Sequence, residues 1–212
     1  DGAACSSVHV LTLKSSAEEA CGAWAQLDAV HAPAARRGHS LTALDGCRFL
    51  AFGGTDADGR ALGDVHILGV VSVHDDSGQG GASWTRCETS GAPPAPRYNH
   101  AACVVARRHV IVYGGMDAGG QILGDLASFD SVLGMWAVLD ATRPRALHRM
   151  LVHAGQIIVM GGLCADGHKA PAGALAASCA SFRVRGGVRF ASDEECAGAR
   201  NVGGGGGDVG AA

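Results

Sequence analysis

Residues 36–54 read RRGHSLTALDGCRFLAFGG and carry an Arg-x-x-His motif, two short runs rich in apolar residues, and a closing pair of glycines. Apolar and polar residues alternate in the first run, and the second run is mostly apolar. The dipeptide Asp45-Gly46 between the runs is a common hairpin turn signal. The stretch therefore predicts a β-hairpin that ends at a glycine pair.

The same arrangement occurs twice more along the chain. Residues 97–115 read RYNHAACVVARRHVIVYGG, and residues 145–162 read RALHRMLVHAGQIIVMGG. The step from the histidine to the first glycine is 14, 14 and 13 residues. Such self-similarity is the signature of a repeat protein. The shared residues are Arg36, His39, Gly53, Gly54, Arg97, His100, Gly114, Gly115, Arg145, His148, Gly161 and Gly162.

The first two units also continue alike. Asp64 and Asp125 each lie 11 residues after the first glycine, and Trp84 and Trp136 close the units, whereas neither feature follows Gly162 at the expected place. The glycine pairs are 61 and then 47 residues apart. Much of the difference falls in the polar, glycine-rich stretch 72–83, which predicts an inserted surface loop. Without it the period is near the ~50 residues of one kind of propeller blade.

The composition limits the fold class and the classes of binding partner. The chain has 33 glycines in 212 residues, and no stretch shows helical periodicity with caps, so the sequence predicts an all-β protein of many short strands. A net charge of −3 gives no broad positive field for nucleic acid. No apolar run approaches the length that spans a membrane. The eight cysteines are dispersed without a C-x-x-C pair, which predicts small buried side chains and a reducing, cytoplasmic compartment.

These residues resemble the kelch repeat, whose marks are the Arg-x-x-His start, the glycine pair, a later aspartate and a spaced tryptophan. The resemblance covers about residues 31–165 and implies a kelch-type β-propeller, here with about three to four blades of four antiparallel strands. Since closed propellers have ~4 to 8 blades, we expect an incomplete, open propeller. The first residue is Asp rather than Met, and we expect the natural amino terminus to lie further upstream.

The expected organisation assigns every part of the chain. Residues 1–30 are expected to be the last two strands of a preceding blade, and residues 31–95 a blade with the inserted loop at 72–83. Residues 96–143 are expected to form the next blade, residues 144–192 a degenerate blade, and residues 193–212 a disordered glycine-rich tail.

The repeated residues have a structural interpretation, because each recurs once per blade. Glycine permits positive φ and close backbone approach where a strand leaves the blade. We expect Trp84 and Trp136 to pack between adjacent blades and the histidines to bond neighbouring strands or loops. Residues 55–59 read TDADG and resemble part of a calcium loop, but no later Glu completes the ligand set, so a turn is expected and no metal or cofactor.

The resemblance implies a platform that binds another protein, without nucleic acid or membrane, through the loops after the glycine pairs and the loops that lead into each blade. Loops of this kind carry exposed polar and aromatic side chains suited to a partner peptide. The expected contact residues are Arg37, Thr55, Asp58, Arg60, Tyr98, Asn99, Met116 and Gln121.

Two alternatives stay open at this stage. Kelch-like copper-radical oxidases need a tyrosine pair and a Cys-Tyr crosslink, but the only two tyrosines here sit at repeat positions; specifier proteins need an iron-binding pattern that is not found. An enzyme is therefore not expected, although further blades could hold such residues. The chain could also select substrates for a larger ubiquitin-ligase or cytoskeletal assembly.

Overall fold

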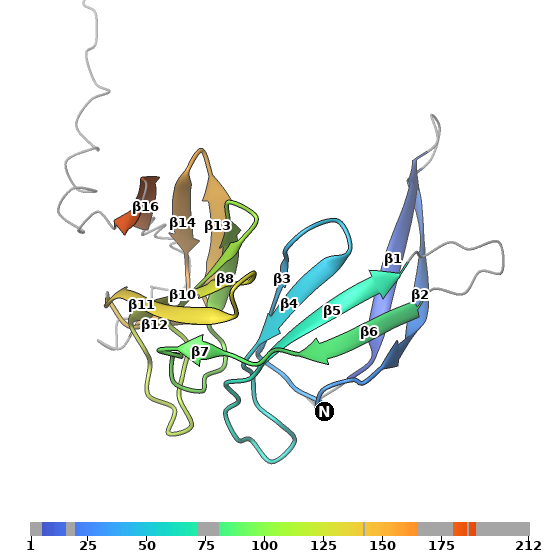
Figure 1. Cartoon of the computed structure of the whole chain (residues 1–212), viewed down its shortest axis with the longest axis horizontal. Helices are drawn as coiled ribbons and strands as arrows, with labels where there is room; N and C mark the ends of the chain where they lie inside the picture. The colour runs from blue at the N-terminus through green and yellow to red at the C-terminus, as the bar shows by residue number, and fades with distance from the viewer. Residues whose placement is uncertain are drawn as a thin grey trace, which may run out of the picture.

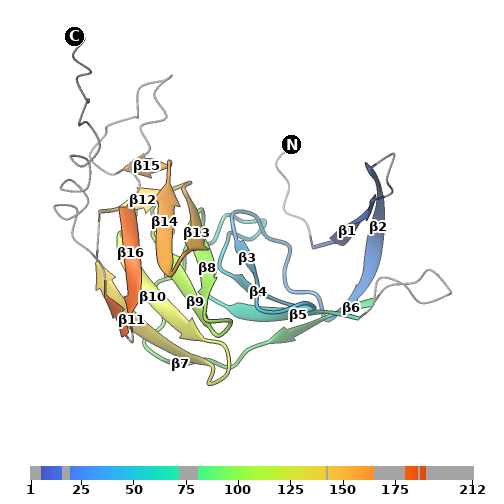
Figure 2. The ribbon, with the colours of Figure 1, turned by 90° about the horizontal axis from the view of Figure 1, so that it is seen from above.

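The computed structural model describes residues 6–15, 20–71, 81–141, 143–164, 180–185 and 187–189, and all regular elements in these ranges are β-strands. The strands form twisted sheets that follow one another around an open arc (Figures 1 and 2). The prediction of an all-β, incomplete propeller is confirmed. Within the same ranges, no helix of the length and apolarity needed to cross a bilayer is found.

Each of the three large sheets contains a unit of four consecutive antiparallel strands, and we number these units as blades in chain order. Blade 1 consists of β3 (Ser40–Ala43), β4 (Arg48–Phe52), β5 (Val65–Val71) and β6 (Gly81–Arg86). Blade 2 consists of β8 (Ala101–Val105), β9 (His109–Tyr113), β10 (Asp125–Asp130) and β11 (Met135–Ala141). Blade 3 consists of β13 (Arg149–His153), β14 (Gln156–Met160), β16 (Ala180–Arg185) and β17 (Gly187–Arg189).

Shorter pairings join the blades at their margins. The hairpin of β1 (Val8–Ser15) and β2 (Ala20–Val30) runs beside blade 1, where β2 pairs in parallel with β6 and Val30 lies opposite Ser83. In the same way β7 (Ser90–Gly91) pairs in parallel with β11, with Ser90 opposite Met135. Strand β2 of the hairpin therefore takes the same place beside the last strand of blade 1 that β7 takes beside the last strand of blade 2. A last pairing joins β12 (Arg145–Ala146) to β15 (Leu163–Cys164).

The hydrophobic core lies between the blades. Successive side chains of a strand point to opposite faces, so a strand inside the arc buries both of its faces. In β9, Val110 and Val112 pack with blade 1, while Ile111 and Tyr113 pack in the cluster that contains Ile157 of blade 3. This explains why the second strand of each unit reads as a continuous apolar run.

The tryptophans differ in their surroundings. Trp136 is 2% exposed and its ring lies 5.0 Å from that of Phe52 in the neighbouring blade and 4.9 Å from that of Phe129. Trp84 is half-buried in the cluster that the β1–β2 hairpin makes with blade 1, and Trp24 on β2 is 70% exposed. Trp136 is buried because a complete blade packs against it, whereas Trp84 has only the two-stranded hairpin beside it among the described residues.

The structure shifts one predicted boundary and leaves others open. Strand β6 begins at Gly81, so the last three residues of the predicted insertion 72–83 belong to a strand that pairs with both β5 and β2. Residues 72–80 and the predicted glycine-rich tail 193–212 lie outside the described residues.

Candidate functional site

The glycine pairs lie where one blade meets the next. Gly53 and Gly54 have φ of +67° and +96°, a left-handed conformation that side chains disfavour, and the later pairs repeat it. A Cβ on Gly53 would collide with the carbonyl oxygen of Arg97 in blade 2, whose close approach allows the Gly54 amide to donate a 2.8 Å hydrogen bond to that oxygen. The Gly115 amide bonds the Arg145 carbonyl oxygen at 2.8 Å in the same way.

Each Arg-x-x-His arginine ties the start of its blade to a later strand. The Arg36 guanidinium donates to both carboxylate oxygens of Asp64 at 2.8 and 3.0 Å, and Arg97 donates to both oxygens of Asp125 at 2.8 and 2.6 Å. Burial would raise the pKa of Asp64, but hydrogen bonds from Arg36 and His66 hold that pKa well below its ordinary range. The Arg145 guanidinium donates to the Gly161 carbonyl oxygen at 2.7 Å.

The motif histidines pack across the blade interfaces. The ring of His100 lies 5.3 Å from that of Phe52, and the ring of His148 lies 4.9 Å from that of Tyr113. Burial, helped by the charge of Arg97, lowers the pKa of His100 to about 3. Burial and the nearby arginines also lower the pKa of His148 to about 4. Both rings are therefore neutral near pH 7 and belong to the blade interfaces.

The third residue of each Arg-x-x-His motif has a left-handed backbone that the sequence reasoning missed. Gly38, Asn99 and Leu147 have φ of +68°, +54° and +58°. The Asn99 amide donates to the Gly38 carbonyl oxygen at 2.8 Å, and the Leu147 amide donates to the Asn99 carbonyl oxygen at 2.9 Å. The sequence did offer a signal for this conformation, because Gly38 and Asn99 occupy equivalent positions and both residue types adopt positive φ readily.

The loops after the first two glycine pairs share one internally bonded conformation. One Asp56 carboxylate oxygen accepts from the amides of Asp58 and Arg60 at 3.0 and 2.9 Å. The Asp117 carboxylate accepts from the amides of Gly119 and Gln121, both at 2.9 Å. These contacts are those of a turn that uses its aspartate to bond its own backbone. Both loops project from the same edge of the arc, below β4 and β10 in Figure 1.

The motif turns lie beside these loops. Isolated backbone bridges join Arg37 to Thr55 and Tyr98 to Met116, so each motif turn is attached to the loop of its own blade. Most of the expected contact residues are accessible, and we call this group the turn surface. It consists of the exposed Arg37, Asp58, Arg60 and Gln121 and the half-buried Tyr98, Asn99 and Met116.

Thr55 is the exception among the expected contact residues. It is only 5% exposed, because it is bridged on one side to Arg37 and on the other to Ala61. Its side chain is thus enclosed by the loop that it begins, and it is not part of the turn surface.

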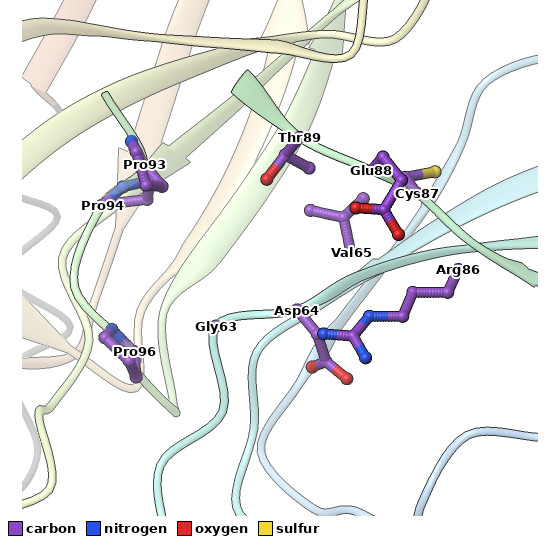
Figure 3. A pocket seen from close by; sticks show the side chains of 10 residues that line it. All are labelled: Gly63, Asp64, Val65, Arg86, Cys87, Glu88, Thr89, Pro93, Pro94 and Pro96. Carbon is purple, nitrogen blue, oxygen red and sulfur yellow. The ribbon is translucent and has the colours of Figure 1, made fainter. Parts of the chain in front are cut away.

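A pocket of about 400 Å³ lies beside the linker between blades 1 and 2, and its outline was not apparent from the sequence. It is lined by the start of β5, the end of β6 and the linker that leads to β8. Figure 3 shows Pro93, Pro94 and Pro96 on one side, facing Val65 and Arg86 on the other. The three prolines of this linker were the signal in the sequence, because proline fixes φ and has no backbone N–H, which favours an extended segment.

The turn surface differs in its chemistry from the contacts inside the fold. Apart from the apolar Met116, its side chains are hydrogen-bonding or aromatic groups, and the loops that carry part of them have internally bonded backbones. The buried histidines and the Arg36–Asp64 pair, by contrast, lie between or within blades. Across the described ranges, no group of three or more His, Cys, Asp or Glu residues gathers in a way that could hold a metal ion.

Comparisons with known proteins find kelch repeats in this sequence. The sequence model of the KLHDC2/KLHL20/DRC7 Kelch-repeats domain matches residues 1–162. The chain is 34% identical over 165 residues to a putative adagio-like protein 2 of Oryza sativa subsp. japonica, covering 74% of this chain and 24% of that protein. It is 30% identical over 146 residues to acyl-CoA-binding domain-containing protein 5 of Arabidopsis thaliana, covering 67% of this chain and 21% of that protein.

An F-box/kelch-repeat protein of Arabidopsis thaliana is 30% identical over 141 residues, covering 61% of this chain and 28% of that protein. The chain thus spans about a fifth to just over a quarter of the length of these relatives.

Proposed function

This chain belongs to the kelch-repeat family, and from that premise we propose that it is a recognition module that binds a peptide or loop of a partner protein through the turn surface. The observation that carries the proposal is the matched geometry of its two loops. Residues 55–61 and 116–122 are separated by a whole repeat, yet each is closed by an aspartate and bridged to its own motif turn.

Such loops support binding because their shape is set before a partner arrives. A loop that must become ordered on binding loses affinity through conformational entropy, and a preorganised loop avoids most of this loss. The exposed side chains stand on backbones that are already hydrogen-bonded. Arginine and tyrosine, present here as Arg37, Arg60 and Tyr98, are among the residues that contribute most at protein interfaces.

We place binding ahead of catalysis for a physical reason. Strongly shifted pKa values often mark catalytic groups, but they also arise in structural networks. Here the shifted groups His100, His148 and Asp64 are held in contacts between blades or strands rather than on the turn surface. Their shifts are explained by burial and by ion pairing within the fold.

Alanine substitution on the turn surface tests the proposal. A peptide-display library is selected on the wild-type protein, and the affinity of a selected peptide is measured by calorimetry. Arg60→Ala and Tyr98→Ala are each expected to weaken binding by about fivefold or more, the scale of a side chain that contributes over ~1 kcal/mol. The Arg60 side chain is exposed and pairs with the exposed Asp58, so its variant should keep the wild-type melting temperature.

Arg48→Ala is the matched control. Arg48 is also an exposed arginine paired with an aspartate, Asp45, but it lies at the opposite end of β4 from the glycine pair. Its substitution should leave peptide affinity unchanged. Equal affinity of the Arg60→Ala, Tyr98→Ala and wild-type proteins would count against the turn surface as the binding site.

A further inference from the structure

The pocket between blades 1 and 2 has walls that backbone hydrogen bonds hold in place. The Cys87 amide donates to the Val65 carbonyl oxygen at 2.9 Å, and the Arg97 amide donates to the Leu62 carbonyl oxygen at 3.0 Å. These bonds attach both ends of the linker, residues 87–96, to the chain around the start of β5. Between them, β7 pairs with β11 of blade 2. The pocket therefore has its shape before any ligand arrives.

One wall of the pocket is apolar and belongs to the linker. The step from the blade tryptophan to the next motif arginine is 13 residues here and 9 residues between blades 2 and 3. The longer linker carries Pro93, Pro94 and Pro96, whose rings stand along one side of the pocket in Figure 3. A Cβ on Gly63 would lie 3.2 Å from the Pro96 ring, so the chain packs closely there. Because proline fixes φ, this wall is stiff.

The opposite wall carries two charged side chains that no described residue neutralises. Arg86 at the end of β6 and Glu88 shortly after it both line the pocket and are exposed. Neither side chain makes a hydrogen bond or an ion pair with the residues that the structure describes. Figure 3 shows the guanidinium and the carboxylate on the same side of the pocket as Val65, across from the prolines.

A third charged group at the pocket, Asp64, is already balanced within blade 1. Its carboxylate accepts from the Arg36 guanidinium at 2.8 and 3.0 Å and lies 2.7 Å from the His66 Nε2. The pocket therefore offers a ligand one free positive group and one free negative group, facing an apolar wall.

A ligand with a single charge fits this pair of groups poorly. A carboxylate attracted by Arg86 is repelled by Glu88, and an ammonium group attracted by Glu88 is repelled by Arg86. In an extended peptide, residues two apart point to the same side and the residue between them points to the opposite side. Arg86 and Glu88 are themselves two positions apart. An acidic and a basic residue on either side of an apolar residue thus match the two walls.

We propose that the pocket binds an extended segment of a partner protein in which an acidic and a basic residue flank an apolar residue. The acidic side chain pairs with Arg86, the basic side chain pairs with Glu88, and the apolar side chain packs on the prolines. The volume of about 400 Å³ is within the ~300–1,000 Å³ of ligand pockets. Paired charges of this kind select a partner because the wrong charge is repelled.

This inference rests on the proposed function, because it names the chemistry of the partner segment that the module recognises. Gly63 lines the pocket and follows the loop of residues 55–61 by two positions. Pro96 also lines it and precedes Tyr98 of the turn surface by two positions. Two residues span at most about 7 Å, so a partner bound at the turn surface can extend into the pocket.

Exchange of the two charges tests the proposal. Peptides are selected from a display library on the wild-type protein and, separately, on the double variant Arg86→Glu/Glu88→Lys, which keeps the net charge and the prolines. The two selections should yield the acidic, apolar and basic residues in opposite orders along the peptide. Calorimetry then measures each peptide on both proteins. Each peptide should bind about tenfold more weakly to the protein on which it was not selected.

A matched control changes a charge elsewhere. Arg107→Glu alters an exposed arginine at the turn between β8 and β9, outside the pocket, and should leave the affinity of the wild-type peptides unchanged. The double variant should keep the wild-type melting temperature, because both side chains are exposed and unpaired among the described residues. Peptides without the two opposite charges, or with equal affinity for both proteins, would overturn the proposal.

The turn-surface variants separate this proposal from the proposed function. If Arg60→Ala and Tyr98→Ala weaken binding and the charge exchange has no effect, the turn surface stands and the pocket proposal is wrong. If only the charge exchange has an effect, the pocket proposal is supported and the turn surface is not the binding site. A library that yields no binding peptide overturns both.

Discussion

At the scale of single residues, a serine decides whether a buried histidine has a hydrogen-bond partner. The His100 Nε2 lies 2.8 Å from the Ser40 hydroxyl of blade 1. His148 occupies the equivalent position in blade 3, but the residue equivalent to Ser40 in blade 2 is Ala101. Both ring nitrogens of His148 are accordingly buried without a hydrogen-bond partner. A buried polar group in this state destabilises the fold.

Ala101→Ser should therefore stabilise the protein by about 1 kcal/mol, the usual net value of one hydrogen bond. The new hydroxyl would lie within hydrogen-bond distance of the His148 ring, as the Ser40 hydroxyl lies beside the His100 ring. Ser40→Ala is the reciprocal variant and should destabilise by a similar or larger amount, since it leaves His100 unpaired. Urea unfolding at low protein concentration measures both. An Ala101→Ser protein less stable than the wild type would show that the position has no room for the hydroxyl.

At the scale of elements, a blade is joined to its neighbour by backbone as much as by side chains. The glycine pair at the end of the second strand receives the carbonyl oxygen of the next Arg-x-x-His arginine. The left-handed φ is found at all three pairs, but among the described residues a next blade approaches closely at the first two alone. Gly114 and Gly161 thus share a conformation and differ in their surroundings.

Gly114→Ala should consequently be much more damaging than Gly161→Ala. Both substitutions place a Cβ in a left-handed conformation, which costs about 1–2 kcal/mol. At Gly114 the Cβ would also collide with the Arg145 carbonyl oxygen and displace blade 3. Urea unfolding at low concentration compares the two variants, with Gly155→Ala, a left-handed turn glycine with open space, as a further reference. Equal losses at Gly114 and Gly161 would contradict the role of the pair in joining blades.

At the scale of the whole molecule, neutral histidines hold the arc together. The pKa of His100 is lowered to about 3 and that of His148 to about 4, from the ordinary 6.5. The unfolded chain therefore binds more protons than the folded chain between these values and pH 6.5. Stability should be full above about pH 6.5 and should fall progressively as the pH decreases toward 4.

The midpoint of urea unfolding at pH 7.5, 6, 5 and 4.5 measures this dependence. His148→Phe keeps an aromatic ring next to Tyr113 but cannot take up a proton, so it should show a shallower decrease than the wild type. A stability that is constant or that rises as the pH falls through this range would contradict the assignment of buried neutral histidines.

Much of the fold was determined by the sequence alone, because its signals are local. A hairpin turn such as Asp45-Gly46, an alternating strand and a glycine that tolerates positive φ each act within a few residues. Their repetition at a constant offset then identified the blades, and the kelch-type fold predicted from them is the one observed. The loops after Gly54 and Gly115 were also located correctly in the chain, because loops follow from where the strands end.

Only the tertiary structure decided which residues of these loops face outward and which blade sides are open. Thr55 was expected at the surface and is enclosed, because its burial depends on Arg37 and Ala61, which approach it only after folding. Met160 and Phe52 hold equivalent sequence positions, yet one is exposed and the other buried. Their difference comes from the neighbouring blade, whose position depends on packing between segments distant in the chain.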